Sequence, residues 1–125
     1  MTRSNTITIF VNRKTADVFD AVLDCPKEIM SDAEKDDDGW WSFTTPRGPA
    51  KMKFNENKQL GILDHLFVDN EATWHVPMRV VSNGEHSAII ITLFKPDNLS
   101  DQLFDERMKE MEKIMENMKQ IIEKT

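Results

Sequence analysis

The sequence has little of what several common kinds of functional site require. Its single cysteine, Cys25, rules out a disulfide within the chain and fits a reducing compartment, and we interpret it as a small buried side chain. The four glycines form no Gly-rich phosphate loop, and no serine stands in a nucleophile elbow. No apolar run is long enough to span a membrane, and residues 1–5 lack the apolar core of a signal peptide. We therefore expect a cytoplasmic protein that does not bind a membrane.

Charge and length narrow the class of protein further. The net charge is −6, which disfavours binding to a phosphate backbone, so we expect no nucleic-acid partner. With 39% hydrophobic and 30% charged residues, the composition is that of a soluble globular protein. A chain of 125 residues can bury a core of its own. We expect a single domain over residues 1–125, either as a monomer or as a homodimer.

An acidic segment over residues 32–39 has the beginning of a metal-binding pattern. Positions one, three, five and six of an EF-hand-like loop are occupied by Glu34, Asp36, Asp38 and Gly39. The twelfth position is Thr45 instead of the bidentate glutamate, so we interpret the segment as a solvated loop. The three histidines and Cys25 have no zinc-ligand spacing either. We therefore expect no metal site and no cofactor.

The first three quarters of the chain consist mainly of strand patterns. β-Branched runs and alternation of apolar with polar residues predict strands over residues 6–11, 40–45, 50–55, 60–68, 74–81 and 85–94. Between the first two strands we expect two short helices, one capped by Thr15 and one that ends at Met30, because Cys25-Pro26 is expected to break the helical pattern. Asn83-Gly84 predicts a two-residue hairpin turn before the last strand.

Residues 100–125 have the pattern of one long amphipathic helix, with Asn98 or Ser100 as its cap. Its apolar stripe consists of Phe104, Met108, Met111, Met115, Met118 and Ile122, widened by Leu103, Ile114 and Ile121. Four of these residues are methionines, whose unbranched side chains adapt to an irregular partner surface. The helix must bury this stripe against another part of the protein.

This order of elements predicts an α+β fold. A curved antiparallel sheet of about six strands is expected to wrap around the long C-terminal helix, which covers its concave face. With Asn83-Gly84 as a turn, Val80 pairs with Ser87, and with Asn70-Glu71 as the preceding turn, His65 lies on the apolar concave face. The outer face then holds Asp64, His75, Arg79, His86 and Thr92. A slip of one residue would exchange the two faces.

Four segments carry a resemblance to a known superfamily. They are Gly61-Ile62-Leu63-Asp64-His65, residues 76–84 (Val-Pro-Met-Arg-Val-Val-Ser-Asn-Gly), Ile91-Thr92-Leu93-Phe94 and Leu99-Ser100-Asp101. With them, nearly the whole chain resembles the START/SRPBCC superfamily, the helix-grip fold of birch-pollen-allergen-like (Bet v 1-like) proteins. Together the four segments resemble a small bacterial branch described as polyketide cyclase/dehydrase-like. The resemblance implies the helix-grip fold and leaves function open, because this fold hosts binders, carriers and enzymes.

The leading functional hypothesis is the binding of a small hydrophobic or aromatic molecule between the sheet and the last helix. The candidate ligand-binding residues are Trp41, Phe43, Met52, Phe54, His65, Phe67, Trp74, Met78, Met111, Met115 and Met118. His65 is the single polar member of this set. The alternative is that the same side chains form a solid core, with His65 a neutral histidine that bonds a neighbouring hydroxyl or carbonyl.

Two hypotheses from other classes also remain open. One is a cyclase, dehydratase or aldol-type enzyme in which His65 is the acid or base and Asp64 or Arg79 supports it. It requires at least two of these side chains in one cavity, whereas a structural salt bridge between Asp64 and Arg79 on the outer face is the competing interpretation. The other is an interaction module, in the manner of chaperone activators that share this fold, which predicts an exposed apolar patch or a dimer contact that includes the last helix.

Overall fold

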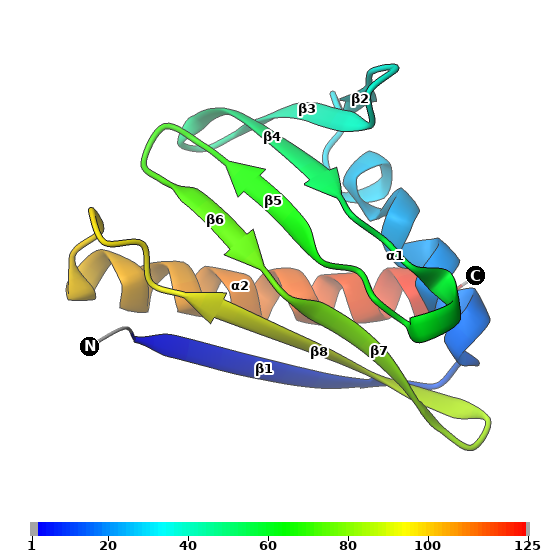
Figure 1. Cartoon of the computed structure of the whole chain (residues 1–125). Helices are drawn as coiled ribbons and strands as arrows, with labels where there is room; N and C mark the ends of the chain where they lie inside the picture. Colours follow the sequence, from blue (N-terminus) through cyan, green and yellow to red (C-terminus); the bar gives the residue numbers. More distant parts are fainter. Residues whose placement is uncertain (1–2, 125) are drawn as a thin grey trace.

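The computed structural model describes residues 3–124, in which a curved antiparallel sheet wraps around a long helix (Figure 1). The elements in chain order are β1 (Ser4–Val11), α1 (Thr15–Ile29), β2 (Glu34–Lys35), β3 (Trp40–Thr45), β4 (Gly48–Phe54), the 3-10 turn η1 (Lys58–Leu60), β5 (His65–Val68), β6 (Thr73–Val76), β7 (Met78–Asn83), β8 (His86–Phe94) and α2 (Asp101–Glu123). The predicted α+β helix-grip fold is therefore confirmed. The predicted helix end at Thr125 lies outside the described residues.

The strands form two hydrogen-bonded ladders, β1-β8-β7 and β2-β3-β4-β5-β6. They separate at Pro77, which divides the predicted strand 74–81 into β6 and β7 because proline has no N–H to donate to a ladder. Across this junction Leu63 N–H donates to Met78 O at 2.9 Å, and Thr92 N–H donates to Pro77 O at 3.0 Å. The Asp64 carboxylate accepts the Met78 N–H at 2.9 Å. These bonds hold the two ladders together as one curved wall.

The predicted strand 60–68 is shorter in the structure, where β5 covers only His65–Val68. The segment before β5 instead crosses close to the backbone of β7. Gly61 has a φ of +68°, and a Cβ at this position would lie 2.4 Å from Val80 O. Val80 N–H donates to Gly61 O at 2.9 Å, so the two backbones are in direct contact. Only glycine combines the left-handed conformation with this close approach.

The register of the sheet is as predicted on one hairpin and shifted on the other. His65 pairs with Val76 in β5 and β6, as expected from the Asn70-Glu71 turn. In the last hairpin Asn83 pairs with His86, so the turn is Gly84-Glu85 and the prediction of Asn83-Gly84 is wrong. Val80 consequently pairs with Ile89 and not with Ser87. The shift is two residues in the partner strand, which leaves every side chain on its predicted face.

One continuous helix replaces the two short helices predicted after the first strand. Pro26 lies inside α1, where it removes only the N–H that would bond Val22 O, and its own carbonyl still accepts the Met30 N–H at 2.9 Å. Val22, Cys25 and Pro26 are all buried, and this packing favours the continued helix. The N-cap residue is Lys14, so Thr15 is the first helical residue rather than the cap.

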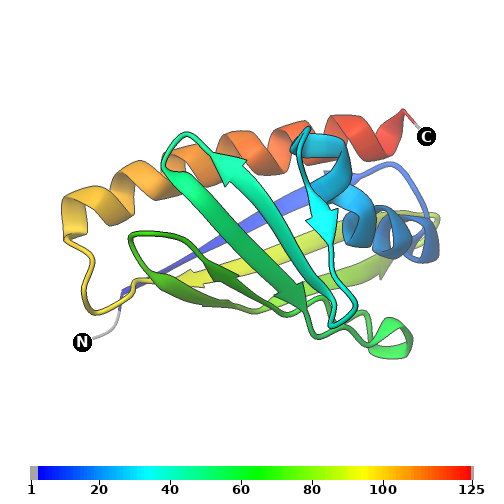
Figure 2. The same cartoon turned by 90° about the horizontal axis from the view of Figure 1, so that it is seen from above.

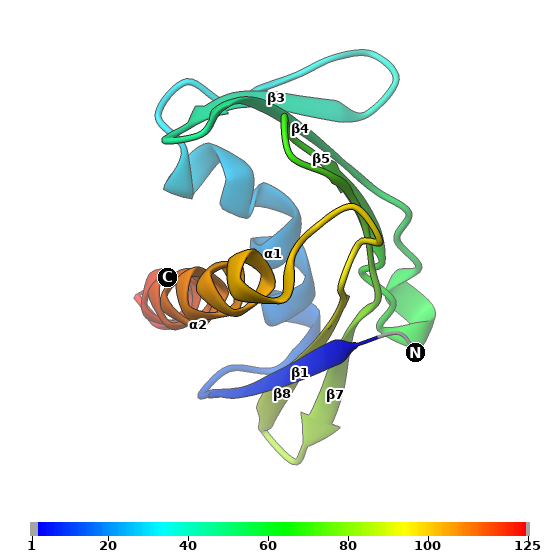
Figure 3. The same ribbon diagram turned by 90° about the vertical axis from the view of Figure 1, so that its left-hand side faces the viewer.

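The helix α2 lies across the concave face of the sheet, next to α1 (Figures 2 and 3). Ser100 is its cap and accepts the Leu103 N–H at 3.2 Å. The predicted stripe faces inward, since Phe104, Met108, Met115, Met118 and Ile122 are buried. Leu103 and Ile114 are 38% and 37% exposed. No helix among residues 3–124 is both long and apolar enough to cross a membrane.

Candidate functional site

A cavity of about 490 Å³ lies between α2, α1 and the concave face of the sheet. The residues from α1 are Val22, Cys25, Pro26 and Ile29, with Met30 directly after the helix. Those from the sheet include Phe43, Met52, Phe54, His65, Phe67, Trp74, Val76, Met78, Ile91 and Leu93. Those from α2 include Met108, Met111, Ile114, Met115 and Met118. Ligand-binding pockets typically have volumes of about 300–1,000 Å³ and mostly apolar walls. The interior is therefore hollow, and the solid-core alternative does not describe it.

Ten of the eleven residues predicted to bind a ligand line this cavity; they are Phe43, Met52, Phe54, His65, Phe67, Trp74, Met78, Met111, Met115 and Met118. Trp41 does not line it. It packs with Phe43 and Ala50 in a separate buried cluster, against Met30 and Ala33. Its ring also lies 5.8 Å from Lys35 Nζ of the two-residue strand β2. The chain between α1 and β3 covers Trp41, which is why this side chain is separated from the cavity.

His65 lies in the cavity wall with one ring nitrogen already bonded. Its Nδ1 is 3.0 Å from Leu63 O. A carbonyl oxygen can only accept, so Nδ1 carries the hydrogen and the Nε2 of the neutral ring is an acceptor. The Phe54 ring lies edge-on at 5.2 Å between centroids. Burial lowers the pKa of His65, which favours the neutral ring.

Asp64 and Arg79 lie outside the cavity and bond to each other. The Arg79 guanidinium donates to the Asp64 carboxylate and also to Met78 O, the latter at 3.0 Å. Consecutive residues of an extended chain point to opposite sides, so Asp64 leaves the wall on the side away from His65. The predicted outer-face ion pair is present, and the three proposed catalytic side chains do not share a cavity.

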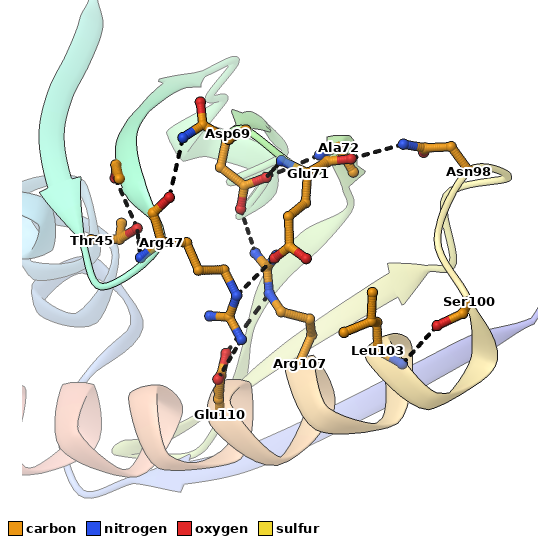
Figure 4. Close-up of polar contacts among 12 residues, drawn as sticks. Thr45, Arg47, Asp69, Glu71, Ala72, Asn98, Ser100, Leu103, Arg107 and Glu110 are labelled. Atoms are coloured by element: carbon orange, nitrogen blue, oxygen red, sulfur yellow. Dashed lines mark hydrogen bonds and ion pairs between the residues drawn. The ribbon is translucent and has the colours of Figure 1, made fainter.

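Five charged residues form a connected group at one side of the cavity, which we call the rim network (Figure 4). It consists of Arg47 between β3 and β4, Asp69 and Glu71 between β5 and β6, and Arg107 and Glu110 on α2. Arg47 contacts Glu71 at 2.7 Å and Glu110 at 2.6 Å, and Arg107 contacts Asp69 at 2.7 Å and Glu71 at 2.9 Å. All but Glu71 line the cavity. The network ties two hairpin turns to the helix.

The inner part of this network is well protected from solvent. The side chains of Asp69 and Arg107 are only 3% and 13% exposed. Asp69 also accepts the N–H groups of Glu71 and Ala72, at 2.9 and 3.0 Å. Burial alone would raise the pKa of Asp69, but the hydrogen bonds from Ala72 and Arg107 outweigh it and the pKa is lowered. The Asp69 carboxylate is therefore held in its charged form.

Sequence reasoning missed the rim network and the contribution of α1. Arg47, Asp69 and Glu71 stand in turns, where the sequence indicates only polar loop residues. The apolar side of the first helix was visible in Val22, but nothing in its spacing showed that it faces a cavity. Cys25 is buried as expected, and burial raises its pKa to about 12. Such a thiol is not a nucleophile at neutral pH.

Comparison with known proteins identifies the fold. No protein-family model matches the sequence, and no curated protein matches it. Among solved structures, Ara h 8.0201 matches with a TM-score of 0.74 and 11% identity over 100% of both chains. Norcoclaurine synthase from Thalictrum flavum, in complex with dopamine and hydroxybenzaldehyde, has a TM-score of 0.74 and 11% identity over 98% of this chain and 87% of that chain. CalU16 from Micromonospora echinospora has a TM-score of 0.71 and 17% identity over 97% of this chain and 74% of that chain.

These identities are low, so the likeness shows the fold alone. The chain has the Bet v 1-like helix-grip fold that the resemblance of its sequence segments predicted. Its assignment to the bacterial polyketide cyclase/dehydrase-like branch stays a prediction.

Proposed function

We propose that this protein binds a small hydrophobic or aromatic molecule in the cavity between α2 and the concave sheet. The observation that carries the proposal is the cavity itself, about 490 Å³ in volume and walled mainly by aliphatic, aromatic and methionine side chains. An engineered cavity of about 150 Å³ binds benzene. A volume about three times as large therefore suits a compound of two or three rings.

The methionine content of the wall favours ligand binding over a packed structural core. Seven of the eight methionines line the cavity: Met30, Met52, Met78, Met108, Met111, Met115 and Met118. Methionine has three rotatable bonds and a polarisable sulfur that contacts aromatic rings favourably. A wall of this kind adjusts to the outline of a ligand at low cost. We expect affinity for several ring compounds of similar size rather than for a single one.

A structural neighbour supports an aromatic occupant. The Thalictrum flavum norcoclaurine synthase was solved with dopamine and hydroxybenzaldehyde, which are both single-ring aromatic compounds. Its identity to this chain is 11%, so it supports the kind of occupant and not its identity.

The two alternative functions have less support. Catalysis by His65 with Asp64 or Arg79 needs two of these groups in one cavity, and only His65 lines it. An interaction module needs a contiguous exposed apolar patch on the last helix. The exposed apolar residues that the structure describes on α2 are Leu103 and Ile114, which are separated by three helical turns.

A fluorescence titration with N-phenyl-1-naphthylamine, an uncharged two-ring probe, tests the proposal. We expect saturable enhancement at one probe per chain. Met111→Trp, which fills the cavity from α2, should weaken binding at least about tenfold. Leu103→Trp is the matched control because Leu103 lies on the same helix, exposed and outside the cavity wall. Absence of saturable binding, or equal binding by the two variants, would refute the proposal.

A further inference from the structure

Most polar groups of the cavity wall are engaged with other protein atoms, and the exposed Lys113 is a donor only. The arginines and carboxylates of the rim network bond to one another. Thr45 donates to Gly48 O at 2.9 Å and accepts the Arg47 N–H at 3.1 Å. Trp74 has a buried Nε1–H with no acceptor in the described part of the chain. This group can only donate a hydrogen bond and cannot accept one. The wall therefore has little spare capacity to accept a hydrogen bond.

His65 is the exception. Its Nδ1–H is used by Leu63 O, and this bond fixes which nitrogen carries the lone pair. Within residues 3–124, no protein donor bonds to Nε2. A neutral imidazole nitrogen is a strong acceptor, and His65 presents this one on a mostly apolar cavity wall. The occupant of the cavity is the natural source of the missing donor.

The position of His65 along the sheet indicates how a ligand would lie in the cavity. It begins β5, whereas Asp69 of the rim network directly follows the same strand, so about 13 Å of extended chain separate them. Phe54 lies opposite His65 on β4, and Phe67 is the next residue on the same face of β5. An aromatic ring that reaches His65 is thus held by aromatic neighbours, at the end of the wall remote from the rim network.

On this basis, and resting on the proposed function, we infer that His65 determines ligand specificity. Its Nε2 accepts a hydrogen bond from a hydroxyl or N–H group of a ring compound, so the cavity selects phenol-like donors over ring compounds of the same shape that carry no donor. The bond pairs the ligand donor with an acceptor on a mostly apolar wall, and about tenfold discrimination is expected.

Two probes of nearly equal shape test the inference, namely 2-naphthol and 2-methoxynaphthalene, titrated into the full-length protein by calorimetry. Wild type should bind the naphthol about tenfold more tightly than the ether. His65→Phe should bind both with affinities within about twofold of each other, and His65→Gln, which restores an acceptor, should recover part of the preference. Phe67→Leu is the matched control, because it alters the wall beside His65 without removing an acceptor and should keep the preference.

The outcomes separate this inference from the function on which it rests. If neither probe binds wild type, the proposed function fails. If both bind wild type equally, or if His65→Phe keeps the preference, ligand binding stands and the role of His65 is wrong. A measurement on the wild-type protein alone guards against a variant that does not fold. In ¹⁵N NMR spectra of the histidine rings, the Nδ1–H tautomer of His65 is expected, with a shift of Nε2 on addition of 2-naphthol; the Nε2–H tautomer would overturn the inference.

Discussion

The Arg107 guanidinium lies over the Trp74 ring, 5.2 Å from its centroid, while the same group contacts the Asp69 carboxylate at 2.7 Å. One side chain of α2 thus binds β6 through an aromatic face and the β5–β6 turn through a charge. Trp74 in turn stacks on Phe104 of α2, with 6.2 Å between ring centroids. Helix and sheet are connected beside the cavity by polar and aromatic contacts together.

Removal of Arg107 should therefore destabilise the fold. Arg107→Ala leaves the buried Asp69 carboxylate without its charged partner and uncovers Trp74, and we expect a loss of about 3 kcal/mol in the free energy of unfolding. Urea denaturation followed by tryptophan fluorescence measures it. Lys109→Ala, an exposed position on the same helix, should change the free energy by less than about 0.5 kcal/mol. Equal effects of the two substitutions would contradict this account of the contact.

Mild acid should lower the free energy of unfolding of the ligand-free protein because His65 is neutral in the folded state. Burial lowers the pKa of this ring below the ordinary 6.5, so between the folded and unfolded values only the unfolded chain binds the proton. The stability that His65 contributes as a neutral ring is fully present above pH 6.5 and is lost as the pH falls through the folded-state pKa.

Urea unfolding at a series of pH values between about 8 and 5 measures this dependence. His65→Phe should flatten the profile in that range, whereas His75→Gln, at an exposed position of β6, should leave it unchanged. A wild-type profile as flat as that of His65→Phe would refute a neutral ring with a lowered pKa.

Cys25 should react with thiol reagents far more slowly in the folded protein than in the unfolded chain. Burial raises its pKa to about 12, so the thiolate is scarce at neutral pH, and the side chain is only 4% exposed. We expect alkylation by iodoacetamide at pH 8 to be at least roughly a thousandfold slower than in the urea-unfolded chain. Mass spectrometry of quenched samples gives both rates. Comparable rates in the folded and unfolded states would show that the thiol is accessible.

Gly61 and Gly84 form a matched pair for testing the junction between the ladders. Both have positive φ, +68° and +64°, but a Cβ at Gly61 would meet Val80 O at 2.4 Å, whereas a Cβ at Gly84 has open space around it. We expect Gly84→Ala to cost about 1 kcal/mol, from backbone strain alone, and Gly61→Ala to cost at least about 3 kcal/mol. Thermal unfolding ranks the two variants, and a smaller effect at Gly61 would mean that the crossing is loose.

Much of the architecture could be predicted because it depends on periodicity. The methionine stripe of α2 steps by three and four residues, and alternation along β5 and β6 placed His65 and Trp74 on one face. The hairpin error at Asn83 was harmless for the same reason, since a shift of two residues preserves the faces.

The features that were missed depend on tertiary contacts. Pro26 was expected to end a helix, but burial of Val22, Cys25 and Pro26 favours one continuous helix. The rim network needs two turns and one helix face to meet, and neither Arg47 nor Asp69 shows in the sequence that it will face Arg107 or Glu110. Trp41 has the alternation expected of a cavity-wall residue, but it packs against Met30 and Ala33 in a separate cluster.

The break at Pro77 has a consequence for the volume enclosed beneath α2. The two ladders are complete within themselves and meet through a small set of bonds around Leu63, Asp64 and Met78. The curved wall therefore has a seam between its two ladders, and the angle between the ladders sets how much space they enclose. A change in that angle would act on the bonds at the seam and not on the hydrogen bonds inside each ladder. Adaptation to ligands of different thickness is then possible at the seam as well as in the methionine side chains.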